Sequence, residues 1–169
     1  MTIDGRARLV GDDVNTDYII TSSRKRQTID ARQLSRYLFE SIAPDFAASV
    51  QPGDILVAGR NFGCGSAMEV AVTVIQAAGI QAVVARTFAR SFYRNAINNG
   101  LPVVECDTAG LGEGDRLSVA LTDDRISVRD VTRGIVRAGA PLPPIMRRIL
   151  EHGGLVPFLT ANGGFGSAV

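Results

Sequence analysis

Gly59-Arg60-Asn61-Phe62-Gly63-Cys64-Gly65-Ser66-Ala67-Met68-Glu69 carries the strongest signal in the chain. It lies between an apolar run at 54–58 and an apolar-rich run at 70–78. The pattern predicts a strand, a glycine-rich turn and a helix over 66–78. Glycines at such a junction let the backbone come close to a ligand, and the helix start leaves unpaired N–H groups facing the same space. We therefore expect an anion-binding site with the Ser66 hydroxyl at its mouth.

The composition is that of an ordinary globular protein. Of 169 residues, 46% are hydrophobic and 21% are charged. We expect one domain over 1–160 and a flexible, glycine- and serine-rich tail over 161–169. The net charge of +1 gives no electrostatic reason to expect nucleic acid or an anionic membrane as a partner. Because the chain shows neither an apolar run of roughly 18 residues nor a secretory signal, we expect no membrane span and a cytoplasmic location.

The chain offers few residues for metal or nucleophilic chemistry. Its two cysteines, Cys64 and Cys106, are too few for a disulfide scaffold and wrongly spaced for a zinc or iron–sulfur site. We expect no metal site in this chain and two buried or half-buried thiols. His152 is the only histidine, so any Ser-His or Cys-His catalytic pair would have to include it. Its place before two glycines is more typical of a helix end.

Strands and helices alternate along most of the chain. The predicted strands are 6–10, 54–58, 82–85 and 102–105, and the predicted helices are 30–40, 44–50, 66–78, 88–98 and 144–151. A hairpin is predicted from 116–121 and 125–129, which flank Thr122-Asp123-Asp124. The polar, basic stretch 21–26 is predicted to be a loop. The fold class is therefore α/β, with a parallel βαβ centre and an antiparallel hairpin.

Four blocks of sequence, taken in order, resemble one known family. They are Gly11-Asp12-Asp13-Val14-Asn15-Thr16-Asp17, Pro52-Gly53-Asp54, the run from Gly59 to Ser66, and the run from Ala89 to Pro102. In this order they resemble the small subunits of 3-isopropylmalate dehydratase, which correspond to the swivelling C-terminal domain of aconitase. The resemblance covers most of the chain, to the helix near residue 150. It implies an aconitase-type swivelling β/β/α domain.

The resemblance also implies an activity and a partner. The family dehydrates and rehydrates hydroxy dicarboxylates, as in a leucine-biosynthesis isomerisation. A [4Fe–4S] cluster is expected on a separate large subunit, so this hydro-lyase chain would bind no cofactor itself and would be active only in a heterodimer or heterotetramer. Matched by position, Ser66 is the residue that takes a proton from carbon. From the residues alone Ser66 would be a helix cap, and the two roles do not exclude each other.

The resemblance places further residues around the substrate. By position these are Gly63, Cys64, Gly65, Ala67, Met68, Thr16 and Asp17. The family pattern Gly-Ser-Ser-Arg-Glu-His-Ala has an arginine for a substrate carboxylate where this chain has Met68, and a second serine where it has Ala67. Replacing a guanidinium by a thioether removes a charge-assisted bond worth ~1.5–3 kcal/mol. Either the substrate differs there or another cation has taken over. Our hypothesis is that Arg24 or Arg26, in the predicted basic loop, reaches the substrate; a solvated or partner-contacting loop is the alternative.

Two other functions stay open. Met68 favours a related dehydratase for another malate-type acid, such as 2,3-dimethylmalate or a homoaconitate-type substrate. A protein of a different class would keep the fold only to bind a carboxylate or a partner without catalysis. A dinucleotide-binding oxidoreductase is set aside, because Met68 takes the place of the third glycine of that fingerprint.

Overall fold

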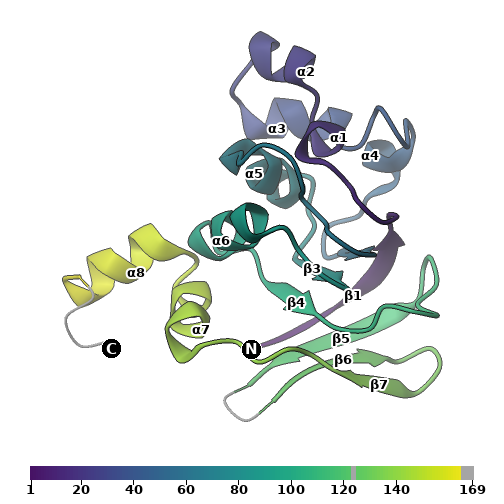
Figure 1. Ribbon diagram of the computed structural model, residues 1–169, viewed down its shortest axis with the longest axis vertical. Helices are drawn as coiled ribbons and strands as arrows, with labels where there is room; N and C mark the ends of the chain where they lie inside the picture. Colours follow the sequence, from purple (N-terminus) through teal and green to yellow (C-terminus); the bar gives the residue numbers. More distant parts are fainter. Residues whose placement is uncertain (123–124, 165–169) are drawn as a thin grey trace.

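The computed structural model describes residues 1–122 and 125–164, which form one mixed sheet of seven strands (Figure 1). The strand order is β4-β3-β2-β1-β5-β6-β7. The strands are β1 (Thr2–Leu9), β2 (Ile55–Ala58), β3 (Ala82–Ala85), β4 (Val103–Glu105), β5 (Arg116–Leu121), β6 (Ile126–Asp130) and β7 (Ile135–Ala138). Strands β1 to β4 pair in parallel, and β5 to β7 are antiparallel. The predicted parallel centre and antiparallel hairpin are both confirmed.

Strand β1 joins the two halves of the sheet because its ends pair with different neighbours. Residues 2–6 pair antiparallel with β5, and residues 7–9 pair parallel with β2. A Cβ on Gly5, next to this change, would lie 2.1 Å from the backbone oxygen of Gly53, so only glycine fits there. The sheet curls at β1, so that β5, β6 and β7 occupy the lower part of the view (Figure 1).

Two helices connect the parallel strands. Helix α5 (Glu69–Ala77) links β2 to β3, and α6 (Arg90–Asn98) links β3 to β4. Both lie on the same side of these strands as α3 (Figure 1). All four residues of β2 and of β3 are buried, as expected for the continuous apolar runs of parallel strands.

The N-terminal helices differ from the prediction. The segment predicted as a loop at 21–26 is instead helix α2 (Ser22–Gln27), whose N-cap Thr21 accepts a hydrogen bond from the Arg24 N–H. Its residues show no apolar period, which is why the pattern missed it. The helix predicted over 30–40 is shorter and broken, although its predicted cap, Asp30, is confirmed. The other elements here are α1 (Thr16–Ile19), α3 (Ala31–Leu34), the 3₁₀ turn η1 (Ser35–Tyr37) and α4 (Phe46–Ser49).

The C-terminal part adds one strand and one helix to the prediction. Strand β7 pairs with β6 at the edge of the sheet, and helix α7 (Pro144–Glu151) lies where it was predicted. Helix α8 (Leu155–Asn162) extends two residues into the predicted tail and ends at Gly163, which adopts the left-handed conformation. Residues 165–169 of that tail, and Asp123 and Asp124 of the hairpin turn, lie outside the described residues. Within the described ranges, no helix is both long and apolar enough to cross a membrane.

Candidate active site

The glycine-rich turn after β2 is held by hydrogen bonds to two distant segments. The Gly63 N–H donates to the Val14 carbonyl oxygen at 2.8 Å, and the Thr16 N–H donates to the Cys64 carbonyl oxygen at 2.8 Å. On the other side, the Phe62 N–H donates to the Thr87 carbonyl oxygen at 3.0 Å. The turn therefore lies between the segment after β1 and the segment before α6, and the backbone fixes its path.

The glycines of this turn are required by close packing against the chain itself. Gly63 has a φ of +78°, and a Cβ there would lie 2.3 Å from the Phe92 ring. Gly65 has a φ of +95°, and a Cβ there would lie 2.5 Å from Oδ1 of Asn15. The close approach of the backbone that the sequence predicted is thus present, but the backbone approaches neighbouring segments of its own chain.

Ser66 stands on the surface, three residues before α5 begins. The N-cap of α5 is Met68, so the prediction that the helix starts at Ser66 and that this residue caps it is wrong. The turn delays the helix because Gly65, in the left-handed region, and Ser66 are committed to contacts with the segment after β1. The backbone carbonyl oxygen of Ser66 accepts a hydrogen bond from Oγ1 of Thr16 at 3.1 Å. The exposed Ser66 hydroxyl is therefore presented by a fixed backbone.

Several backbone amide groups adjoin Ser66 along the chain without donating a hydrogen bond to the described residues. Within residues 1–122 and 125–164, the backbone N–H groups of Gly65, Ser66, Ala67 and Met68 donate no hydrogen bond. The first turn of α5 adds further N–H groups and the positive end of its dipole. Such a cluster of donors stabilises an anion placed beside Ser66.

Thr16 and Asp17 begin helix α1, which adjoins the same turn through the hydrogen bonds of Thr16. Thr16 is 1% exposed. The Asp17 carboxylate accepts hydrogen bonds from Oγ of Ser22 at 3.0 Å and from Nζ of Lys25 at 3.2 Å. These hydrogen bonds, Lys25 first, lower the pKa of Asp17. Asp17 therefore connects α1 to α2.

The cations of α2 have different surroundings. Arg24 donates to both carboxylate oxygens of Glu40, at 2.9 and 3.0 Å, and its guanidinium lies 3.7 Å from the centre of the Tyr37 ring. Arg26 is exposed. Lys25, which was not among the predicted site residues, places Nζ 2.7 Å from Sδ of Met68. The sequence contained one indication that Lys25 is unusual, because it is the only lysine among the 18 lysines and arginines.

The thiols do not assemble a metal site. Cys64 is half-buried beside Ser66, and Cys106 is buried. Burial raises the pKa of the Cys106 thiol to about 11. The part of the chain that the structure describes holds no group of three or more His, Cys, Asp or Glu side chains able to bind a metal ion. These residues do not fit an iron–sulfur cluster.

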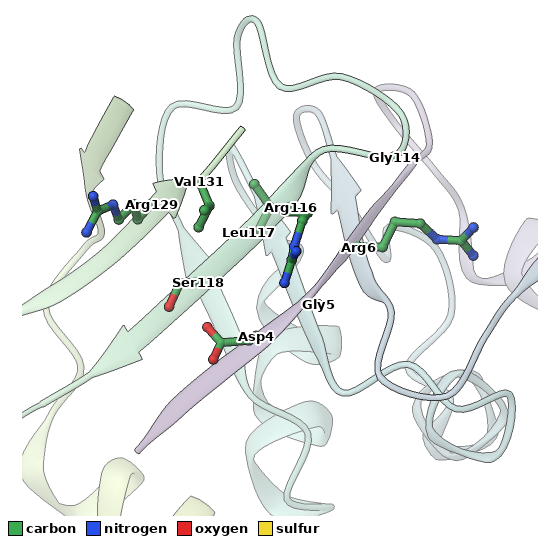
Figure 2. A pocket seen from close by; sticks show the side chains of 9 residues that line it. All are labelled: Asp4, Gly5, Arg6, Gly114, Arg116, Leu117, Ser118, Arg129 and Val131. Atoms are coloured by element: carbon green, nitrogen blue, oxygen red, sulfur yellow. The ribbon is translucent and has the colours of Figure 1, made fainter. Parts of the chain in front are cut away.

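Ser66 lies in neither of two hollows on the surface. One, of about 710 Å³, lies on β1, β5 and β6, where Asp4 and Ser118 face each other and Arg6 points away (Figure 2). It includes none of the predicted site residues. A second, of about 290 Å³, lies beside the start of α5 and is lined by Lys25, Thr28, Ile29, Glu69, Val70 and Thr73. Ser66 lines neither hollow, so its surroundings are open on this chain.

The chain is similar to known proteins over nearly its whole length. A family model described as the aconitase C-terminal domain matches residues 19–108. The 3-isopropylmalate dehydratase small subunit of Moorella thermoacetica is 45% identical over 161 residues, which are 94% of this chain and 95% of that protein. Small subunit 1 of the same enzyme from Methanopyrus kandleri is 45% identical over 163 residues, with 95% and 94% covered. The crystal structure of 3-isopropylmalate dehydratase from Methanocaldococcus jannaschii matches with a TM-score of 0.90 and 40% identity, covering 96% of both chains.

Proposed function

The chain belongs to the family of 3-isopropylmalate dehydratase small subunits, and from that premise we propose that Ser66 is its catalytic base in the dehydration of a hydroxy dicarboxylate. The observation that carries the proposal is the open Ser66 hydroxyl among amide groups that donate no hydrogen bond within the described ranges. The resemblance seen in the sequence is confirmed at the level of the family. The role of Ser66 is what the experiment below tests.

A serine is a poor base in water, and the surroundings of Ser66 make it a better one. A serine alkoxide is strongly disfavoured in water at neutral pH. Amide donors and a helix dipole that face the oxygen lower this cost once water is excluded. In the dehydration step the Ser66 alkoxide takes the proton from carbon and becomes a hydroxyl, and the C–H electrons form the alkene. The hydroxyl on the adjacent carbon leaves with its bonding electrons and takes up a proton, which gives water. The reverse step adds water to the alkene.

A large subunit completes the site. Relatives of this chain are named small subunits, which implies a larger partner. Exposed apolar side chains lie on the neighbouring segments, with Tyr18 of α1 46% and Ile29 after α2 95% exposed. A partner that covers them also excludes water from Ser66. Because the described residues of this chain do not fit a cluster, we assign the [4Fe–4S] group implied by the resemblance to that partner, in a heterodimer or heterotetramer.

Two candidate substrates differ in the side chain that would contact this turn. Gly63, Cys64, Gly65 and Ala67 form the turn around Ser66, and the half-buried Met68 adds an apolar side chain to it. 3-Isopropylmalate is the first candidate substrate, by family. Met68 favours 2,3-dimethylmalate or another malate-type acid as the second candidate, since a thioether is an adaptable apolar contact.

The test is reconstitution with the large subunit under anaerobic, iron-replete conditions. The complex should turn over at least one acid of a malate panel, and the isolated chain should turn over none. Ser66→Ala should lower kcat at least about a hundredfold while the complex still assembles on gel filtration. Ser41→Ala, at another exposed serine, is the matched control and should keep full activity. Activity of the isolated chain, or of the Ser66→Ala complex, would contradict the proposal, and carboxylate binding without turnover would favour a non-catalytic module.

A further inference from the structure

We propose that Lys25 is the cation that binds a substrate carboxylate beside Ser66, an inference that rests on the proposed function. Met68 follows Ser66 by two residues, and Nζ of Lys25 lies 2.7 Å from its sulfur atom. The side chain of Lys25 therefore reaches from α2 across to the mouth before α5. A positive charge stands at the position where the neighbouring backbone also offers N–H donors.

The present partners of this ammonium leave it available for a ligand. It has three donors, and the structure gives it two partners among the described residues, the Asp17 carboxylate at 3.2 Å and the Met68 thioether at 2.7 Å. A thioether is a weak hydrogen-bond acceptor. A carboxylate oxygen that replaces the sulfur forms a charge-assisted bond, which is stronger. Binding of a carboxylate here thus improves the contacts of Lys25 without breaking its ion pair.

The ion pair with Asp17 holds the ammonium in place. The side chain of Lys25 is 19% exposed, so it is packed along its length instead of moving freely in water. Asp17 is itself bound by Ser22 at 3.0 Å, and its N–H donates to the N-cap residue Asn15 at 2.9 Å. We assign Asp17 as the residue that positions Lys25. Because Asp17 remains bound, Lys25 binds the substrate as one point charge, not as a two-pronged group.

The other cations of α2 are less suited to this role. Arg24 is bound by Glu40 through two hydrogen bonds, so it reaches a substrate only by breaking them. Arg26 is exposed and has no hydrogen-bond or ion-pair partner within residues 1–122 and 125–164. Lys25 is the basic side chain of this helix that contacts the site residues.

The first experiment measures kinetics on the reconstituted complex. Lys25→Met should raise KM for the acid that the wild-type complex turns over by roughly ten- to a hundredfold, with a smaller change in kcat. The double variant Lys25→Met with Met68→Arg should bring KM back to within about threefold of wild type, because the charge returns at the same place. Arg32→Met removes an exposed cation from the adjacent helix α3 and should leave KM unchanged. An active complex whose KM does not change in Lys25→Met would overturn the proposal.

The second experiment does not depend on turnover. Because Lys25 is the only lysine of this chain, an amine-reactive reagent labels this chain at Lys25 and the N-terminal amine alone. In the Ser66→Ala complex, saturating 3-isopropylmalate or 2,3-dimethylmalate should slow labelling of Lys25 at least about tenfold, with the N-terminal amine as internal control. Turnover by wild type without protection of Lys25 by either acid overturns this proposal. Protection of Lys25 combined with no turnover by the wild-type complex overturns the catalytic role of Ser66 and leaves Lys25 as a carboxylate-binding residue.

Discussion

Oγ1 of Thr16 donates a hydrogen bond to the backbone carbonyl oxygen of Ser66 at 3.1 Å and so joins two segments that lie 50 residues apart in the chain. The Thr16 N–H also donates to the Cys64 carbonyl oxygen at 2.8 Å. One buried residue therefore fixes the backbone on both sides of Gly65. This pair of bonds fixes the backbone that carries the Ser66 side chain.

The first prediction follows from that hydrogen bond. Thr16→Val keeps the shape of the side chain and removes its hydroxyl, so the Ser66 carbonyl oxygen loses its hydrogen bond from Thr16. We expect kcat of the reconstituted complex to fall about tenfold and the free energy of unfolding of the isolated chain to fall by about 1 kcal/mol. Urea unfolding and steady-state kinetics measure the two effects. Thr16→Ser should restore both, and equal activity of the valine variant would show that the Ser66 backbone is held without Thr16.

The second prediction concerns Gly65 and uses Gly114 as its control. Both have positive φ, +95° and +82°, but an added Cβ at Gly114 meets nothing within 4 Å, whereas at Gly65 it meets Asn15. Gly114→Ala should therefore lower the free energy of unfolding by about 1 kcal/mol, the cost of the backbone conformation alone. Gly65→Ala should lower it by about 2–4 kcal/mol, because steric overlap is added, and should also lower kcat. Equal losses of stability in the two variants would mean that Asn15 moves aside freely.

The fold was largely accessible from the sequence because its central elements are apolar runs with clear ends. Strand β3 and helix α7 lie at their predicted bounds. Helix α2 was missed because it is polar throughout and is begun by the Thr21 cap. The helix predicted over 30–40 is broken after Leu34, where Oγ of Ser35 donates to the Arg32 carbonyl oxygen at 2.8 Å and competes with helical pairing.

The site was accessible in part. Short motifs in the sequence identified Thr16, Ser66 and Met68 as candidate site residues. The structure places Thr16 against the Ser66 backbone. Lys25 was missed because its proximity to Met68 depends on α2 being helical, whereas the sequence predicted a loop there. A charged residue that comes from a different helix produces no recognisable spacing pattern near Ser66 in the sequence.

The third prediction concerns the two thiols. The pKa of Cys106 is raised to about 11 by burial, so at pH 8 only about one Cys106 in a thousand is ionised. Cys64 is half-buried beside Ser66. Ellman's reagent at pH 8 should therefore titrate one thiol per folded chain rapidly and two after denaturation. Cys64→Ser should remove the rapid thiol, and binding of the large subunit should slow its reaction if the partner covers this mouth. Rapid reaction of both thiols in the folded chain would contradict the burial of Cys106.

The fourth prediction concerns Asp54, which begins the run into β2. Its side chain is 3% exposed, and its oxygens accept from Arg6 at 2.8 and 3.1 Å, from Arg8 at 3.4 Å and from the Gln51 N–H at 2.9 Å. Burial by itself raises the pKa of Asp54, but the hydrogen bonds, that of Arg6 first, outweigh burial and lower it. A carboxylate with a lowered pKa stabilises the folded chain above the unfolded value of about 3.9, and this contribution is lost as the pH falls through the folded value.

Asp54→Asn should therefore cost about 3 kcal/mol of unfolding free energy at pH 7, because Arg6 loses its ion pair and the buried Arg8 keeps only Glu113 as a charged partner. The difference from wild type should shrink as the pH falls below about 4, where Asp54 of the unfolded wild-type chain becomes protonated, and should be smallest once the pH has passed the lower pKa of the folded chain. Urea unfolding at several pH values between 7 and 3 measures this difference directly. Asp45→Asn, at an exposed residue whose side chain makes no cap hydrogen bond, is the control and should follow wild type throughout. A difference for Asp54→Asn that stays constant with pH would show that packing, and not charge, is what the chain loses.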